Sequence, residues 1–250
     1  MRPNIFMLSL NAIKIGGEEL KKVLRNEKKF LLDPVEASNI SSCISKILMK
    51  DPHNDASGYI VRSLYFDTVY NSDFMNKEFG LEKRKKIRLR LYDPKLDYAF
   101  LEMKQKDGSL QYKRSLKVNK QDALELIKGN YSVLLTYDQP FATELFSVMN
   151  MEMYRPAAVV QYNRKAYIAK ENNIRITFDS NIIANESNFN IFDEKLLLYP
   201  VFDKYNTVLE VKYNGFLLSY IKDIIRDANK SEVSVSKYSL SRTIGMHFNF

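Results

Sequence analysis

The sequence has few of the residues that build covalent or metal-centred sites. Of its 250 residues none is Trp, only two are His, and Cys43 is the single cysteine. One cysteine excludes an intramolecular disulfide framework, and two histidines leave too few ligands for a Cys/His metal centre. A reducing, cytoplasmic location therefore fits the sequence best.

Long apolar runs are also missing. No window approaches the roughly 18 apolar residues that a membrane-spanning helix needs. The run Ile5–Leu10 is far too short and has no small-residue cleavage pattern, so it predicts a frayed start or a short packing helix. We expect no integral membrane segment, and any membrane contact to be peripheral or through a partner.

Positive charge and aromatic residues are abundant instead. The net charge is +8, and the chain has 16 Tyr and 15 Phe. This balance points to a polyanionic partner such as phosphate chains, nucleic acid or a membrane surface. No Pro/Gly/Ser-rich linker divides the chain, so we expect an N-terminal extension over residues 1–24 and one domain over 25–250.

The polar and apolar pattern predicts an α+β fold, an eight-stranded antiparallel β-barrel with helices packed outside. The predicted strands cover residues 25–32, 59–67, 83–92, 98–106, 110–118, 157–169, 173–178 and 207–213. Predicted helices cover residues 34–49, 70–79, 120–128, 139–151 and 216–229. In the last helix, six apolar side chains are expected to face the core: Phe216, Leu217, Tyr220, Ile221, Ile224 and Ile225.

Alternate residues of a strand share a face, and several predicted strands have one wholly ionic face. In residues 86–91 three cations alternate with three aliphatic side chains. The spacing Glu-x-Lys occurs three times, in Glu27/Lys29, Glu102/Lys104 and Glu210/Lys212. Further shared faces carry Tyr162 with Arg164, and Arg175 with Thr177 and Asp179.

These faces have two interpretations. They are either the solvated outside of a sheet, or the lining of a barrel whose ionic side chains point inward. Unpaired buried cations are costly, so an inward face requires water and an anion. Arg and Lys suit phosphate oxygens, and the interspersed Glu residues suit Mg²⁺ or Mn²⁺.

A nucleic-acid surface is the less favoured interpretation. The basic run Lys83–Lys86 fits the solvated start of a strand, and the aromatic residues do not interleave with it. Lys113 is placed to reach the mouth of a barrel, although a solvated face explains it equally well. His53 and His247 receive no role.

Eight short motifs follow one another along the chain: Arg25-x-Glu27-x-Lys29-Phe30, Ser63-Leu64-Tyr65-Phe66-Asp67, Arg88-Leu89-Arg90, Glu102-x-Lys104, Tyr162-Asn163-Arg164, Arg175-Ile176-Thr177-Phe178-Asp179, Leu209-Glu210-Val211-Lys212 and Ser236-Lys237-Tyr238. In this order they resemble the VTC domain family, the polyphosphate polymerase branch of the triphosphate tunnel metalloenzymes, over Arg25 to Tyr238.

The resemblance implies a tunnel that transfers a phosphoryl group from ATP to polyphosphate with Mn²⁺ or Mg²⁺. The implied phosphate ligands are Lys29, Arg88, Arg90, Lys104, Tyr162, Arg164, Arg175, Lys212, Ser236 and Lys237. Lys237, Glu210 and Arg164 are the implied catalytic residues. Glu210 is the implied principal metal ligand, with Glu27 and Glu102 as further ligands.

Three activities stay open. The chain is a polyphosphate polymerase, a metal-dependent triphosphatase acting on inorganic triphosphate or a nucleoside triphosphate, or a non-catalytic polyphosphate-binding module. Arg25 stands where the hydrolase branch has a first Glu, which favours the polymerase over the hydrolase. A chain without the phosphate-sensing domain and membrane anchor of the eukaryotic polymerases is expected to be bacterial.

Overall fold

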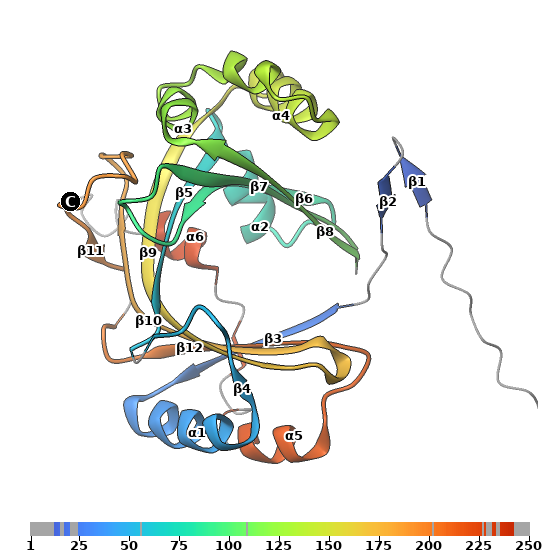
Figure 1. Ribbon diagram of the computed structural model, residues 1–250, viewed down its shortest axis with the longest axis vertical. Helices are drawn as coiled ribbons and strands as arrows, with labels where there is room; N and C mark the ends of the chain where they lie inside the picture. The colour runs from blue at the N-terminus through green and yellow to red at the C-terminus, as the bar shows by residue number, and fades with distance from the viewer. Residues whose placement is uncertain are drawn as a thin grey trace, which may run out of the picture.

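The computed structural model describes residues 13–15, 18–20, 25–55, 57–108, 110–201, 203–226, 228, 232–233 and 236–242 (Figure 1). The run Ile5–Leu10 lies outside these residues. β1 (Ile13–Ile15) and β2 (Glu18–Leu20) form a separate two-stranded sheet.

The main sheet is antiparallel and follows a path of eight strands. Their order is β3 (Arg25–Leu32), β12 (Thr207–Asn214), β10 (Ile174–Asn185), β9 (Tyr154–Ala169), β5 (Tyr59–Thr68), β6 (Arg84–Leu91), β7 (Tyr98–Asp107) and β8 (Leu110–Asn119). Two short strands extend it: β4 (Met49–Lys50) pairs with β9, and β11 (Tyr199–Pro200) pairs with β10. The predicted α+β class and the eight-strand count are confirmed.

The sheet curls around a central space, as Figure 1 shows. Among the described strands no backbone pairing joins β3 to β8, so the hydrogen-bonded ladder is not strictly closed. One ion pair links the two sides across the interior, because Lys104 Nζ on β7 lies 3.3 Å from Glu27 Oε2 on β3. Both side chains line the same cavity.

Helices cover the outer face of the sheet in two groups. α1 (Pro34–Ile47) and α5 (Ser219–Ile225) pack on β3, β12 and β10, where Phe30, Ile44 and Leu209 are fully buried. α1 begins as predicted: Asp33 accepts hydrogen bonds from the backbone N–H groups of Val35 and Glu36, and Pro34 fills the first turn.

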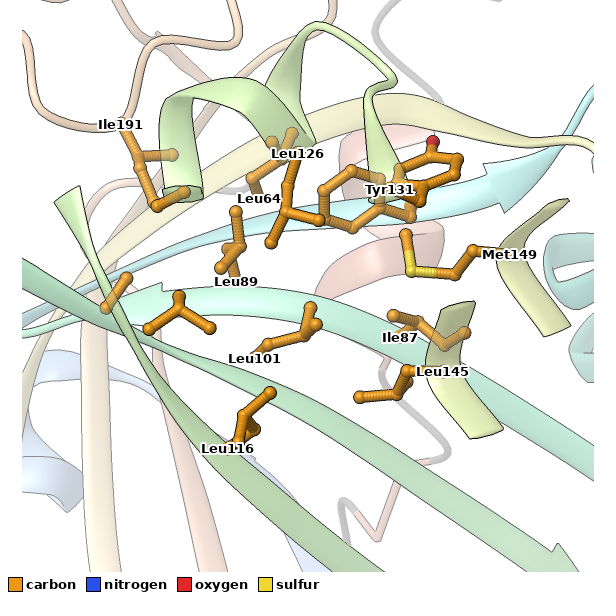
Figure 2. Close-up of a cluster of buried hydrophobic side chains, with 14 of the residues drawn as sticks. Leu64, Ile87, Leu89, Leu101, Leu116, Leu126, Tyr131, Leu145, Met149 and Ile191 are labelled. Atoms are coloured by element: carbon orange, nitrogen blue, oxygen red, sulfur yellow. The ribbon is translucent and has the colours of Figure 1, made fainter. Parts of the chain in front are cut away.

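The second group is α3 (Lys120–Ile127), the 3₁₀ helix η1 (Tyr131–Thr136) and α4 (Pro140–Met151). These elements bury the aliphatic faces of β5 to β8, as Figure 2 shows. Leu64, Ile87, Leu89, Leu101 and Leu116 all lie at 0–1% exposure there. Helices thus cover the apolar face, which leaves the polar face turned toward the inside.

Two further helices, α2 (Ser72–Glu78) and α6 (Lys237–Arg242), pack against each other and against β5, β6, β9 and β10. Tyr238 of α6 stacks on Tyr65, with ring centroids 4.9 Å apart. Its hydroxyl donates to Asp67 Oδ2 at 2.5 Å, and the same carboxylate accepts from the backbone N–H groups of Asp73 and Phe74. Asp67 therefore anchors both helices against β5.

Several predicted boundaries were wrong. α1 ends at Ile47 because Met49 and Lys50 pair with β9. β9 starts at Tyr154 and includes Pro156, and a bulge in β9 accommodates it: Tyr65 pairs with Ala158 and Phe66 with Pro156, so Ala157 is the extra residue. β10 continues past residue 178 to Asn185 across an irregularity between residues 180 and 183.

The last predicted helix is shorter than expected, since α5 covers only Ser219–Ile225. Ile221 and Ile225 form its buried stripe, and Leu217 is buried just before the helix begins. Phe216 and Tyr220 were wrongly predicted to face the core, because they are 64% and 46% exposed. Both lie off that stripe.

Candidate functional site

A cavity of about 670 Å³ occupies the inner face of the curled sheet. All ten residues predicted to bind phosphate line it, together with Glu27 and Glu210. The ten are Lys29, Arg88, Arg90, Lys104, Tyr162, Arg164, Arg175, Lys212, Ser236 and Lys237. With the other lining residues included, all eight long strands and α6 contribute side chains to this one space.

The alternation of β6 shows why the ionic side chains point inward. Arg88 and Arg90 line the cavity, whereas Ile87 and Leu89 are fully buried against the outer helices. Because successive strand residues face opposite sides, covering the aliphatic face with helices fixes the cationic face on the inside. The interpretation as a solvated outer face is therefore wrong for this strand.

Asp179 holds two cations of the site. Arg164 Nε and Nη2 each donate to a different oxygen of its carboxylate at 2.7 Å, and Lys237 Nζ lies 2.6 Å from Oδ2. Burial would raise the pKa of Asp179, but Arg164 and Lys237 outweigh it and lower that pKa. The sequence placed Asp179 on the ionic face without a role, and its position as the direct register partner of Arg164 supplies one.

The aromatic ring of Tyr162 lies beside the same cations. The guanidinium carbon of Arg164 is 5.1 Å and Lys237 Nζ is 4.8 Å from the ring centroid. These are cation–π distances, so the ring stabilises both charges. Tyr162 therefore acts here through its ring face.

Glu102 contacts three cations rather than open space. Its Oε2 accepts from Arg88 Nε at 2.8 Å and lies 3.8 Å from Arg90 Nη1, while Oε1 lies 2.6 Å from Lys113 Nζ. Although burial opposes ionisation, these charges lower the pKa of Glu102 to about 2. Lys113 also lines the cavity, which favours the first of the two interpretations left open for it, a position at the mouth of the barrel.

Glu27 and Glu210 share one corner of the cavity. The register of β3 and β12 sets Glu210 opposite Lys29, and Lys212 opposite Glu27. Within the strands, Lys29 Nζ lies 3.0 Å from Glu27 Oε1, and Lys212 forms an ion pair with Glu210. Burial alone would raise the pKa of both carboxyl groups, but the surrounding cations outweigh this effect. The pKa of Glu27 is lowered to about 2, and the pKa of Glu210 lies well below its ordinary value.

The three predicted metal ligands do not form one cluster. Among the described residues, no three His, Cys, Asp or Glu side chains gather in a group that could hold a metal ion. Glu27 and Glu210 lie close enough that each charge affects the other, whereas Glu102 is engaged by the arginines. A metal at this corner would therefore have two carboxylates from the protein.

Arg175 lies near Tyr59 and Asp51. Its Nη2 lies 2.8 Å from Asp51 Oδ2 and donates to the Tyr59 hydroxyl at 3.1 Å. Asp51 also accepts from the backbone N–H of His53 and contacts Nδ1 of that ring at 2.8 Å. Asp51 was not predicted as a site residue, because it lies in a polar turn with no strand pattern to place it.

Lys86 and Tyr65 are two further cavity residues that the sequence analysis did not select. Lys86 Nζ donates to Ser236 Oγ at 2.7 Å, and Arg88 Nη1 donates to the Tyr65 hydroxyl at 3.2 Å. Burial lowers the pKa of Lys86 to about 8. Lys86 was assigned to a solvated basic run, which is wrong, although it does share the inward face of Arg88.

The arrangement is suited to a polyvalent anion. Ten of the cavity-lining residues are Lys or Arg and two are Glu. Carboxylates such as Asp179 and Glu102 orient the cations and offset part of the cost of burying them, while the lining keeps excess positive charge. Guanidinium groups held in this way offer paired N–H donors to phosphate oxygens.

The comparisons agree on the fold. The model of the VTC domain family matches residues 24–244. HpAC1 from Hippeastrum, a candidate adenylyl cyclase described as having a dominant triphosphatase activity, has a TM-score of 0.52 at 13% identity, covering 87% of this chain and 96% of its own. A candidate adenylate cyclase from Vibrio parahaemolyticus has a TM-score of 0.50 at 10% identity, covering 88% of this chain and 98% of its own.

At these identities the two structures establish the likeness of fold alone, which is the triphosphate tunnel fold. A search of curated proteins gives no match. Within the described part of the chain, no helix has the length and apolar character needed to cross a bilayer.

Proposed function

The chain belongs to the VTC domain family, and from this membership we propose that its tunnel transfers the terminal phosphoryl group of ATP to a polyphosphate chain. Family and fold together support phosphoryl chemistry on a triphosphate. The observation that carries the proposal is the convergence of ten cationic side chains on one cavity with only two lining carboxylates.

The proposed roles follow from the contacts. Arg88 and Arg90 are held by Glu102, and Arg164 and Lys237 by Asp179, so all four are positioned before an anion arrives. In the transfer, a terminal oxygen of the acceptor phosphate attacks the γ-phosphorus, the bond to the bridging β,γ-oxygen breaks, and ADP leaves. Such a step needs alignment and charge neutralisation more than covalent catalysis.

Glu210 and Glu27 are the proposed ligands of Mg²⁺ or Mn²⁺. Mg²⁺ is commonly held by one or two carboxylates together with substrate phosphates, and this corner offers two ionised carboxylates, so the residues present fit the ion. When bound, the ion would neutralise charge on the phosphate oxygens. Glu102, engaged by Arg88, Arg90 and Lys113, is better suited to orienting those cations.

Hydrolysis is the second candidate, favoured by one observation. The fold resembles that of HpAC1, which is described as having a dominant triphosphatase activity. The same cavity would then bind a triphosphate, with water in place of the acceptor phosphate. A module that binds polyphosphate without turnover is the third outcome.

One assay separates the three. Purified protein is incubated with ATP and Mn²⁺ or Mg²⁺, and the products are resolved on a gel. The proposal predicts chains of polyphosphate that increase with time. Free phosphate without chains would establish the hydrolase, and binding of ATP without turnover would establish the module.

A further inference from the structure

Aromatic side chains gather at one end of the cationic cavity. Tyr59, Tyr92, Phe100 and Tyr98, here called the aromatic rim, form a continuous series of ring contacts. Successive ring centroids are 6.0, 6.4 and 5.6 Å apart, each pair in an edge-to-face arrangement. Residues of β5, of β7 and of the turn after β6 thus build one aromatic surface.

The rim adjoins the cationic groups directly. Tyr59 and Tyr92 line the same cavity as the arginines, and the Tyr59 hydroxyl accepts a hydrogen bond from Arg175. Phe100 is the register partner of Arg90. Tyr92 follows Arg90 by two residues, a step of about 6.6–7 Å along an extended chain. The cavity therefore changes from cationic to aromatic over one such step.

Packing of a hydrophobic core does not account for the whole rim. Tyr92 is 40% exposed, whereas Tyr238 on α6 is 1% exposed and stacked on Tyr65. Tyr98 and Phe100 are half-buried, and Lys117 Nζ lies 3.9 Å from the centroid of the Tyr98 ring. The rim thus keeps accessible aromatic surface beside a site for anions, a combination typical of pockets for organic phosphates.

We propose that the aromatic rim binds the base of a nucleoside triphosphate whose phosphates lie on Arg90, Arg175 and the cations beyond them. The inference rests on the proposed function and deepens it, because it separates two kinds of ligand. A nucleotide uses both rim and cations, whereas an inorganic phosphate chain uses the cations alone. The rim then selects the nucleotide as phosphoryl donor.

The recognition is by stacking and is tolerant of base identity, since every base has a π-face. Nucleotides with adenine and guanine are therefore expected to bind alike.

The test compares two ligands on the full chain by calorimetry. The ligands are the β,γ-imido analogue of ATP and inorganic tripolyphosphate, with EDTA present so that neither is turned over. The variant is Tyr92→Leu, which removes the ring but keeps apolar bulk, and Tyr220→Leu on the outer helix α5 is the matched control at similar exposure. Phe100→Leu is a second rim variant in case Tyr92→Leu does not fold.

Either rim variant should lower the affinity for the ATP analogue at least about fivefold, as expected when one stacking interaction is removed. Tripolyphosphate affinity should change less than about twofold, and Tyr220→Leu should match the wild type for both ligands. An equal decrease for both ligands, or no decrease for either, would overturn the role of the rim while leaving the cationic site intact. Failure of the wild type to bind either ligand would overturn the proposed function as well.

Discussion

Arg164 and Asp179 face each other as register partners on β9 and β10, joined by two hydrogen bonds of 2.7 Å. Lys237, from a helix near the end of the chain, contacts the same carboxylate at 2.6 Å. One fully buried acid therefore positions two cations from distant parts of the sequence. The proposed site depends on this acid although it is not expected to touch substrate.

Replacing Asp179 with Asn should destabilise the protein by about 3–5 kcal/mol, because removing one partner of a buried ion pair leaves the other charges uncompensated. Urea denaturation at neutral pH measures the change in the free energy of unfolding. Asp223→Asn on the exposed face of α5 is the control, with an expected change within about 0.5 kcal/mol. An Asp179→Asn protein as stable as the wild type would contradict the role given to this carboxylate.

The pH dependence of that difference gives a second check. Since the folded-state pKa of Asp179 lies below its ordinary value, its stabilising contribution is present above the unfolded pKa of about 3.9. It is lost as the pH falls through the folded value. The difference in the free energy of unfolding between the wild type and Asp179→Asn should therefore become smaller in acid. A difference that stays constant below about pH 4 would show that it comes from packing and not from the charge of Asp179.

Anion affinity should fall at alkaline pH. Burial lowers the pKa of Lys86 and of Lys212 to about 8, so both are protonated below that value and increasingly neutral above it. The last proton of tripolyphosphate also leaves in this range and adds negative charge to the ligand, which opposes the decline. Tripolyphosphate titrations from pH 7 to 10 on the wild type and on the double variant Lys86→Arg, Lys212→Arg separate the two effects. The affinity of the wild type should fall relative to that of the double variant above about pH 8, and profiles of the same shape for both proteins would rule out these lysines as ligands.

Arg88→Ala or Arg90→Ala should weaken binding of tripolyphosphate by about 1.5–3 kcal/mol for each charge-assisted hydrogen bond that the substitution removes. Both arginines line the cavity, so the weakening is expected in direct binding experiments without metal. Arg155→Ala removes an exposed cation of β9 and serves as the control. Unchanged affinity in both cavity variants would place the phosphates elsewhere.

Glu210→Ala should abolish metal-dependent turnover of ATP while leaving tripolyphosphate binding in EDTA intact or tighter, since one negative charge leaves the cavity. Glu194→Gln, at an exposed position, is the control. Turnover and metal-free binding are measured on the same preparations. Undiminished turnover would refute Glu210 as the principal metal ligand.

The cationic lining of the site could be predicted from the sequence because the alternation of side chains along a strand is a local property. Lys86-Ile87-Arg88-Leu89-Arg90 has only two possible orientations, and the family resemblance indicated the inward one. The carboxylates that form ion pairs with these cations could not be predicted from strand alternation. Asp179 contacts Lys237 from a distant part of the sequence, and Asp51 reaches Arg175 from a turn, so only the folded arrangement assigns them.

Other differences have equally physical causes. The strand was predicted to start at residue 157, directly after Pro156, whereas β9 starts at Tyr154 and has the extra residue of a bulge, Ala157, beside the proline. Phe216 and Tyr220 were wrongly predicted to be buried for different reasons: Phe216 precedes the first residue of α5, and Tyr220 lies beside the buried stripe of Ile221 and Ile225. The incomplete closure of the sheet depends on how β3 and β8 approach, which no local pattern encodes.

The most direct test of the account is a crystal structure of the protein soaked with inorganic tripolyphosphate. The account predicts phosphorus density inside the curled sheet, with phosphate oxygens within hydrogen-bonding distance of Arg88, Arg90 and Arg164. The account would be contradicted if tripolyphosphate bound only on the outer surface and no phosphate oxygen contacted these arginines.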